Sequence, residues 1–252
     1  MAKLAKRSAR EETGLFLVEG PQAVSEALAF RAALVVDLFM TAAAMDRYAD
    51  ISRAAAASGI EPETVSEQVL ETMADTVTPQ GVVAVARQFP VTVKELLAGG
   101  SKLVAILDEV RDPGNAGTII RAADAAGADG VILTGKSVDA YNPKVVRSTT
   151  GSLFHVAIAQ GGELDAAVKA VKHAGMRVLA ADIAGDDLPT VRDRLPEPTA
   201  WLFGNEAHGL TDESLRFADA VVKVPIYGHA ESLNLATAAS VCLYESAFAQ
   251  RA

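Results

Sequence analysis

Polar side chains follow three of the apolar runs in the second half of the sequence. The runs LVAIL, AWLFG and AVVKVP each lead into a loop whose residue types can do chemistry. An arginine can hold a phosphate and stabilise negative charge, while amide, hydroxyl and carboxylate groups can orient a substrate. In an open parallel sheet such loops meet at the carboxyl ends of the strands, where ligands bind. In chain order, the candidate residues are Asn115, Arg121, Glu206, Ser232 and Asn234.

Each candidate also has an ordinary structural interpretation. Asn115 can cap the helix that it precedes, and Arg121 can pair with Asp124 on a solvated helix face. Ser232 taken alone is an ordinary cap for the last helix. His208 invites a catalytic role, but it has no serine or cysteine partner in a motif, so we expect it to be a bystander. The local patterns leave these alternatives open.

Other catalytic devices are missing from the sequence. No G-x-G-x-x-G fingerprint follows LVAIL, and the sequence has no phosphate loop or metal-ligand cluster. The single cysteine, Cys242, allows neither an internal disulfide nor a cysteine-based metal site. These features argue against a nucleotide-dependent metabolic enzyme and predict no metal. They also fit a reducing, cytoplasmic setting.

The pattern of apolar runs predicts two α/β domains. With 252 residues, 50% of them hydrophobic and only 5% aromatic, the chain must build its cores mainly from Ala, Val, Leu and Ile. Residues 1–96 read as a small α/β domain with a basic tail. In residues 97–252, near-continuous apolar strands alternate with helices, which predicts a mostly parallel sheet covered on both faces.

The charge distribution limits how the protein can meet nucleic acid. The formal net charge is −9, so any contact with RNA or DNA must come from local basic clusters and not from the whole surface. No apolar run approaches the ~18 residues of a membrane span, and the N-terminal segment lacks the apolar core of a signal peptide. We therefore expect a protein of the cytoplasm.

Three motifs resemble those of the SpoU (TrmH-like) family of RNA ribose 2′-O-methyltransferases, in the SPOUT class. They are DPGNAGTIIRAADAAG, FGNEAHGL and VPIYGHAESLNLATAASVCLYE, in the order of the family, and YNPKVVRSTTGSLFHV is similar to its intervening segment. The agreement covers most of residues 103–247. The N-terminal FLVEGPQAVSEAL resembles a substrate-binding domain related to ribosomal proteins that bind kinked RNA.

This resemblance implies a deep trefoil knot, a homodimer formed through the last helix, and S-adenosylmethionine as the cofactor. It implies that the cofactor is surrounded by Thr134, Gly204, Asn205, Val224, Ile226 and Leu233. It also implies that the five candidate residues form the catalytic pocket, with Glu206 bracing the knot and Asn115 orienting Arg121. For Arg121 we favour a role as phosphate anchor over one as general base, because neutralising an arginine at pH 7 costs about 7 kcal/mol.

The resemblance also implies an RNA substrate, ribosomal RNA before transfer RNA. Two groups of basic residues are expected to hold it, although a solvated disordered arm is an equal interpretation of the first group. One is the tail, with Lys3, Lys6, Arg7 and Arg10, and the other surrounds the active face, with Arg111, Lys144 and Arg147. A rival hypothesis is an RNA-binding protein of the same fold that has lost the chemistry; the complete set of five candidate residues argues against it.

Overall fold

The computed structural model describes residues 2–252, and within them the chain divides into two compact units. One unit comprises the chain up to Phe89 together with Asp139–His155, and the other comprises Pro90–Val138 and Val156–Ala252. The chain therefore passes between the units three times. This division differs from the predicted domains 1–96 and 97–252, because residues 90–96 pack with the second unit and the segment 139–155 packs with the first.

The first unit is built on a four-stranded sheet with the order β1-β4-β2-β3. β4 pairs antiparallel with β1 and β2, while β3 runs parallel to β2. The strands are β1 (Leu15–Glu19), β2 (Val35–Thr41), β3 (Glu63–Val65) and β4 (Val82–Arg87). The helices of this unit are α1 (Arg7–Thr13), α2 (Pro21–Arg31), α3 (Ala42–Arg47), α4 (Ala49–Ala57), α5 (Glu67–Met73) and α8 (Pro143–Thr149). Short 3-10 turns span Ala2–Ala5, Ala32–Leu34 and Ser152–Phe154.

The basic N-terminal segment packs onto its own unit. Arg10 in α1 is 1% exposed, and its guanidinium pairs with Asp139 at 2.6 Å and donates to the carbonyl oxygens of Leu4 and Ala5. A buried arginine persists only when its charge and donors are satisfied in this way. The expectation that Arg10 grips RNA is therefore wrong, as is the alternative of a disordered arm for residues 2–13.

The second unit is built on a six-stranded sheet with the order β10-β8-β9-β5-β6-β7. All five strand pairs are parallel, as the sequence predicted. The strands are β5 (Leu103–Asp108), β6 (Gly130–Thr134), β7 (Ala157–Gln160), β8 (Arg177–Asp187), β9 (Thr199–Phe203) and β10 (Ala220–Lys223). The helices are α6 (Val93–Leu97), α7 (Pro113–Ala125), α9 (Leu164–His173), α10 (Asp212–Leu215) and α11 (Leu235–Gln250), and a 3-10 helix spans Leu188–Arg194.

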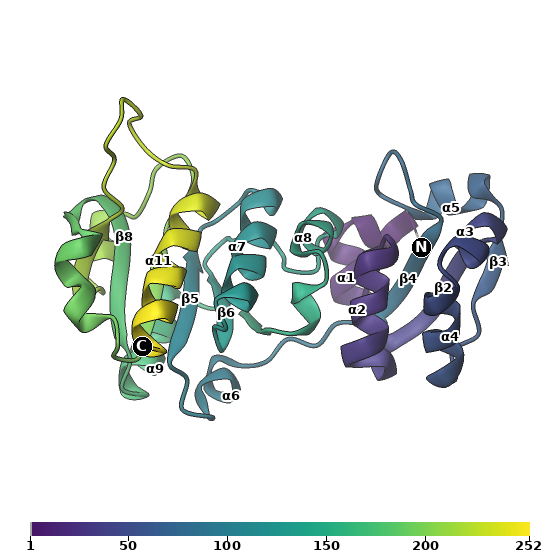
Figure 1. Ribbon diagram of the computed structural model, residues 1–252, viewed down its shortest axis with the longest axis horizontal. Helices are drawn as coiled ribbons and strands as arrows, with labels where there is room; N and C mark the ends of the chain where they lie inside the picture. The colour runs from purple at the N-terminus through teal and green to yellow at the C-terminus, as the bar shows by residue number, and fades with distance from the viewer. Residues whose placement is uncertain (1) are drawn as a thin grey trace. The chain divides into compact units, whose positions relative to one another are not determined.

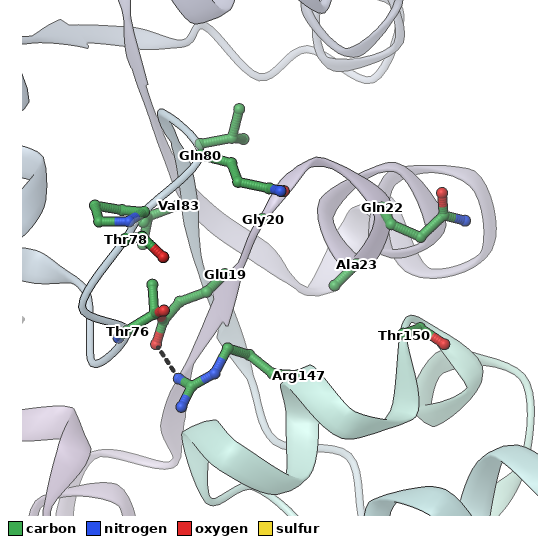
Figure 2. Close-up of a pocket in the computed structure, with 12 residues that line it drawn as sticks. Glu19, Gly20, Gln22, Ala23, Thr76, Thr78, Gln80, Val83, Arg147 and Thr150 are labelled. Carbon is green, nitrogen blue, oxygen red and sulfur yellow. Dashed lines mark hydrogen bonds and ion pairs between the residues drawn. The ribbon is translucent and has the colours of Figure 1, made fainter.

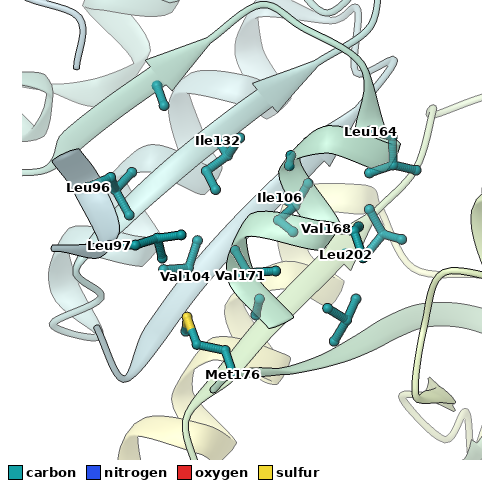
Figure 3. Packing of buried hydrophobic residues seen from close by; sticks show 14 of the residues in the cluster. Leu96, Leu97, Val104, Ile106, Ile132, Leu164, Val168, Val171, Met176 and Leu202 are labelled. Carbon is teal, nitrogen blue, oxygen red and sulfur yellow. The ribbon is translucent and has the colours of Figure 1, made fainter. Parts of the chain in front are cut away.

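Helices cover both faces of this sheet. On one face, α6 and α9 pack against alternate strand residues such as Val104 and Ile106 (Figure 3). On the other, α7 and α11 lie side by side against the strands (Figure 1), and Trp201 of β9 donates from its indole nitrogen to Ser246 of α11 at 2.9 Å. Successive residues of a strand point to opposite faces, so β5 and β9 need apolar residues throughout.

The parallel arrangement brings the candidate loops to one edge of the sheet. β5 and β9 are neighbours, and the loops after them begin beyond Asp108 and Phe203. β10 joins this edge through β8, and the chain after Lys223 leads into α11. Among residues 2–252, no helix is both long and apolar enough to cross a membrane.

Candidate active site

The Glu206 carboxylate joins the loop after β9 to the loop after β5. It accepts hydrogen bonds from the backbone nitrogens of Arg111 at 3.2 Å and Asp112 at 2.9 Å. It also accepts from the side-chain amide of Asn115 at 3.3 Å. Three donors on one carboxylate fix the two loops relative to each other. The predicted bracing role of Glu206 therefore has a definite set of partners here.

Glu109, just before these partners, has a strained backbone. Its φ is +55°, a left-handed conformation that costs a residue with a side chain about 1–3 kcal/mol. The side chain of Asn205 donates to its carbonyl oxygen at 2.8 Å. The Arg111 guanidinium and the backbone nitrogen of Lys136 bind its carboxylate at 2.8 Å each and lower its pKa, Arg111 most. The surroundings thus hold this loop in one conformation.

The helix α7 begins with a cap that we did not predict. Asp112, and not Asn115, is the N-cap residue, and its carboxylate accepts from the Asn115 backbone nitrogen at 2.8 Å. Pro113 follows at the first helical position, which suits its fixed φ. The side chain of Asn115 is therefore available for the Glu206 contact and for a second one, described next.

Asn234 connects the start of α11 to the start of α7. Its side-chain nitrogen donates to the Asn115 side-chain oxygen at 3.0 Å. Its own side-chain oxygen caps α11 by accepting from the backbone nitrogens of Ala236 and Thr237. The interpretation of Ser232 as the cap of this helix is therefore wrong. Ser232 lies two residues before the cap, with an exposed side chain.

Arg121 stands apart from this network. It lies in the second half of α7 and is exposed. Among the contacts described for residues 2–252, its guanidinium has no hydrogen-bond or ion-pair partner. Within residues 2–252, Asn115 does not orient Arg121 through a hydrogen bond as predicted. Its side chain bonds Glu206 and Asn234 instead. The guanidinium is therefore free to meet an incoming anion.

A cavity of about 350 Å³ opens beside the network, between strand β8, the loops after β9 and β10 and the start of α11. Sequence reasoning missed the segment Ala181–Ile183 of β8, which lines it. The position of β8 between β9 and β10 would have suggested this segment. The apolar pattern of the sequence does not predict that strand order. Predicted residues that line the cavity are Asn205, Glu206, Val224, Ile226, Ser232 and Leu233.

Two of the predicted cofactor residues do not line this cavity. Thr134 is completely buried, and its hydroxyl donates to the Asp108 carboxylate at 2.9 Å, so it fixes the end of β5. Gly204 is required by its own chain: a Cβ there would lie 2.5 Å from the backbone of Gly209. The close approach that the glycine permits is therefore with the turn 205–209, and not directly with a ligand.

The same turn borders a second cavity, of about 580 Å³, on the side of β5. Arg111 lines it with a largely exposed side chain that pairs with Glu109 at 2.8 Å. Arg111, one of the basic residues predicted around the active face, also donates its backbone nitrogen to Glu206. Lys144 and Arg147 both lie on α8, which belongs to the first compact unit.

The remaining tail residues are near the surface of the first unit. Arg7 is exposed and pairs with Glu11 one helical turn away at 2.8 Å. Lys6 is the residue before the first turn of α1, and Lys3 lies in the preceding 3-10 turn. These three lysine and arginine side chains remain accessible, unlike that of Arg10.

A parallel α/β unit with a cavity built from strand-end loops belongs to the class of α/β proteins that bind small ligands at the carboxyl ends of their strands. Family models divide the chain further: residues 102–244 match the SpoU rRNA methylase family, and residues 1–84 match the MRM3-like substrate-binding domain. The chain therefore belongs to the SpoU rRNA methylase family, as its motifs predicted.

Individual relatives extend over nearly the whole chain. The 23S rRNA (guanosine(2553)-2′-O)-methyltransferase RlmP of Bacillus subtilis is 35% identical and covers 96% of this chain and 92% of its own. The AviRb SpoU methyltransferase of Streptomyces viridochromogenes, solved with AdoMet, superposes with a TM-score of 0.83 at 33% identity, covering 99% and 96% of the two chains. An AdoMet-bound rRNA methyltransferase of Sinorhizobium meliloti gives 0.81 at 33% identity, covering 97% and 91%.

Proposed function

We propose that this protein transfers the methyl group of S-adenosylmethionine to a ribose 2′-hydroxyl of ribosomal RNA. The products are 2′-O-methylated RNA and S-adenosylhomocysteine, and the hydroxyl proton leaves through phosphate or water. The observation that carries the proposal is the network in which Glu206, Asn115 and Asn234 tie three loops together at the rim of a cavity. Relatives named as 23S rRNA 2′-O-methyltransferases favour ribosomal over transfer RNA. The match of residues 1–84 to a substrate-binding domain supports a large substrate.

The residues of the cavity suit the cofactor. Val224, Ile226 and Leu233 offer apolar surface for an adenine ring, and the loops offer backbone groups for its polar edge. The cavity volume of about 350 Å³ falls in the range of small-molecule sites, ~300–1,000 Å³. When bound, S-adenosylmethionine supplies an electrophilic methyl group that needs little further activation. Binding by loops agrees with the missing dinucleotide fingerprint.

The residues of the protein then have to position the ribose hydroxyl and to stabilise the negative charge that develops on its oxygen. In-line placement of the ribose oxygen ~3–3.5 Å from the methyl carbon supplies much of the rate. We assign Arg121 to the target phosphate, because its guanidinium is exposed and has no partner among residues 2–252. As a base it would first have to lose a proton at a cost of about 7 kcal/mol. Ser232 and Asn234 would orient the ribose.

The knot and the dimer belong to the same proposal. The proposal includes a trefoil knot, in which the hydrogen bonds from the loop after β5 to Glu206 and from Asn234 to Asn115 would hold the knotted segments together. On α11, Tyr244 and Phe248 stay 37% and 66% exposed with their rings 5.6 Å apart. A second copy of the chain would cover this apolar pair. The reducing cytoplasm suits a protein whose one cysteine, Cys242, is free and buried.

Methyl transfer from labelled S-adenosylmethionine tests the function directly. Purified ribosomal RNA and transfer RNA would be offered separately, and the labelled nucleotide mapped. We expect label in ribosomal RNA, at a ribose that resists alkaline cleavage. Label found only in transfer RNA would identify transfer RNA as the substrate. Binding of RNA without any methyl transfer would favour the non-catalytic alternative.

A further inference from the structure

The first unit holds a cavity of about 330 Å³ that the proposed chemistry does not use (Figure 2). Its walls are formed by the end of β1, the start of α2 and the residues between α5 and β4. Arg147 of α8 and the C-cap residue Thr150 complete the lining. Residues 1–84 match the substrate-binding domain, whereas Arg147 and Thr150 fall in the range that matches the methylase family. Neither matched region builds this cavity alone.

The charges around the cavity argue against an anionic ligand. The Glu19 side chain is 3% exposed and accepts from Arg147 at 3.1 Å, a contact marked by the dashed line in Figure 2. The other amino group of Arg147 pairs with Asp75 at 3.0 Å. One cation thus faces two carboxylates, so a phosphate entering here would meet a local excess of negative charge. This local charge balance disfavours the expectation that Arg147 contacts an RNA phosphate directly.

Neutral polar groups supply the recognition chemistry instead. Thr76, Thr78 and Gln80 line the cavity, and within residues 2–252 their side chains make no hydrogen bond. Pro79 and Val83 add apolar surface beside them. A side-chain amide and two hydroxyls can both donate and accept. Together with an apolar wall, they match the edge and the face of a nucleobase, which is how proteins read unstacked bases in RNA.

The loop that carries these groups is held at both ends. At its start, the Glu19 carboxylate accepts from the backbone nitrogens of Asp75 and Thr76 at 3.1 Å each. At its end, Gly81 has a φ of +80°, and a Cβ there would lie 2.7 Å from Ala44. A site fixed in this way loses little conformational freedom when a ligand binds.

We propose that this cavity takes one unpaired nucleobase of the RNA substrate, with Gln80, Thr76 and Thr78 bonding its edge. The inference rests on the proposed function, since it assumes an RNA substrate. Arg147 acts as a positioning residue that holds Glu19 and Asp75 in place. Because the recognition is neutral, the site adds affinity without adding a phosphate contact.

Photo-crosslinking locates the site without knowledge of which RNA is bound. The full-length protein would be irradiated with total cellular RNA containing 4-thiouridine, and the crosslinked peptides identified by mass spectrometry. We expect adducts on residues 76–83. Adducts only on other segments would overturn the inference while leaving the function intact, and a protein that crosslinks to no RNA would overturn both.

Affinity and its salt dependence then separate a base from a phosphate. On the crosslinked RNA species, Gln80→Ala combined with Thr78→Val should weaken binding roughly tenfold, with an unchanged slope of log K against log salt. The matched control is Gln68→Ala, an exposed glutamine of the same unit outside the cavity, which should bind like the wild type. Wild-type affinity in the double variant, or a slope reduced by about one, would rule out a base pocket.

Discussion

Asn234 donates its side-chain amide to the Asn115 side-chain oxygen at 3.0 Å, across 119 residues of sequence. The same Asn234 caps α11 through its side-chain oxygen, and the same Asn115 donates to Glu206. Each side chain therefore uses both ends of its amide. The start of the last helix and the start of α7 cannot shift independently while these bonds hold.

The two ends of the Asn234 amide can be tested separately. Asn234→Asp keeps an oxygen to cap α11 and removes the donor to Asn115, so stability should stay near that of the wild type while methyl transfer falls. Asn234→Ala removes both functions and should also cost about 1 kcal/mol of unfolding free energy. Urea unfolding and single-turnover transfer measure the two effects. Equal stability of the two variants would contradict the capping role.

Arg121 should matter for transfer and not for the cofactor. Arg121→Ala should keep the dissociation constant of S-adenosylmethionine within about twofold and lower the transfer rate by roughly 100-fold or more, the typical effect of removing a group that stabilises developing charge. Calorimetry and a labelled-methyl assay provide the two measurements. Arg194→Ala, which removes another exposed arginine of the same unit, serves as the control. A parallel loss of cofactor binding would refute this division of labour.

Arg10 should contribute to stability in a way that its neighbour Arg7 does not. Breaking the buried pair with Asp139 leaves an uncompensated charge, so Arg10→Ala should lower the unfolding free energy by about 3–5 kcal/mol. Arg7→Ala removes an exposed pair with Glu11 and should change it by less than about 1 kcal/mol. Denaturant unfolding of both variants makes the comparison. Similar values for the two would mean that the Arg10 pair is not formed in solution.

The exposed aromatic pair on α11 should be required for the proposed dimer. Phe248→Glu places a charge beside Tyr244, and a second copy of the chain could not bury it without a large desolvation cost. Light scattering after size-exclusion chromatography should show a monomer for this variant and a dimer for the wild type. Val69→Glu, on an exposed position of α5, should leave the dimer intact. A monomeric wild type would remove the dimer from the proposal.

Cys242 should be unreactive in the native protein. Desolvation by burial raises the pKa of its thiol from 9.0 to about 12, and the thiolate is the reactive form. Because the folded pKa exceeds the unfolded one, this group adds stability that is complete below pH 9 and is lost as the pH rises towards 12. A thiol reagent at pH 8 should label the protein only in denaturant. Rapid native labelling would indicate that α11 opens.

The architecture and the family could be predicted from the sequence, whereas the individual contacts in the site could not. Apolar runs of strand length predicted the parallel sheet, and three motifs predicted the family. The helix caps could not be predicted, because Asp112 and Asn115, or Ser232 and Asn234, are all good caps and local spacing does not choose between them. The burial of Arg10 and of Thr134 depends on partners far away in sequence, Asp139 and Asp108.

The return of Asp139–His155 to the first unit limits how this protein can be divided. A fragment that ends at Phe89 would lack Asp139, the partner of Arg10, and Arg147, the partner of Glu19. Two buried charges would then be left without their counterions. Chimaeras that exchange the two family-matched regions at their sequence boundary should therefore fold poorly unless α8 and its flanking residues travel with the N-terminal part.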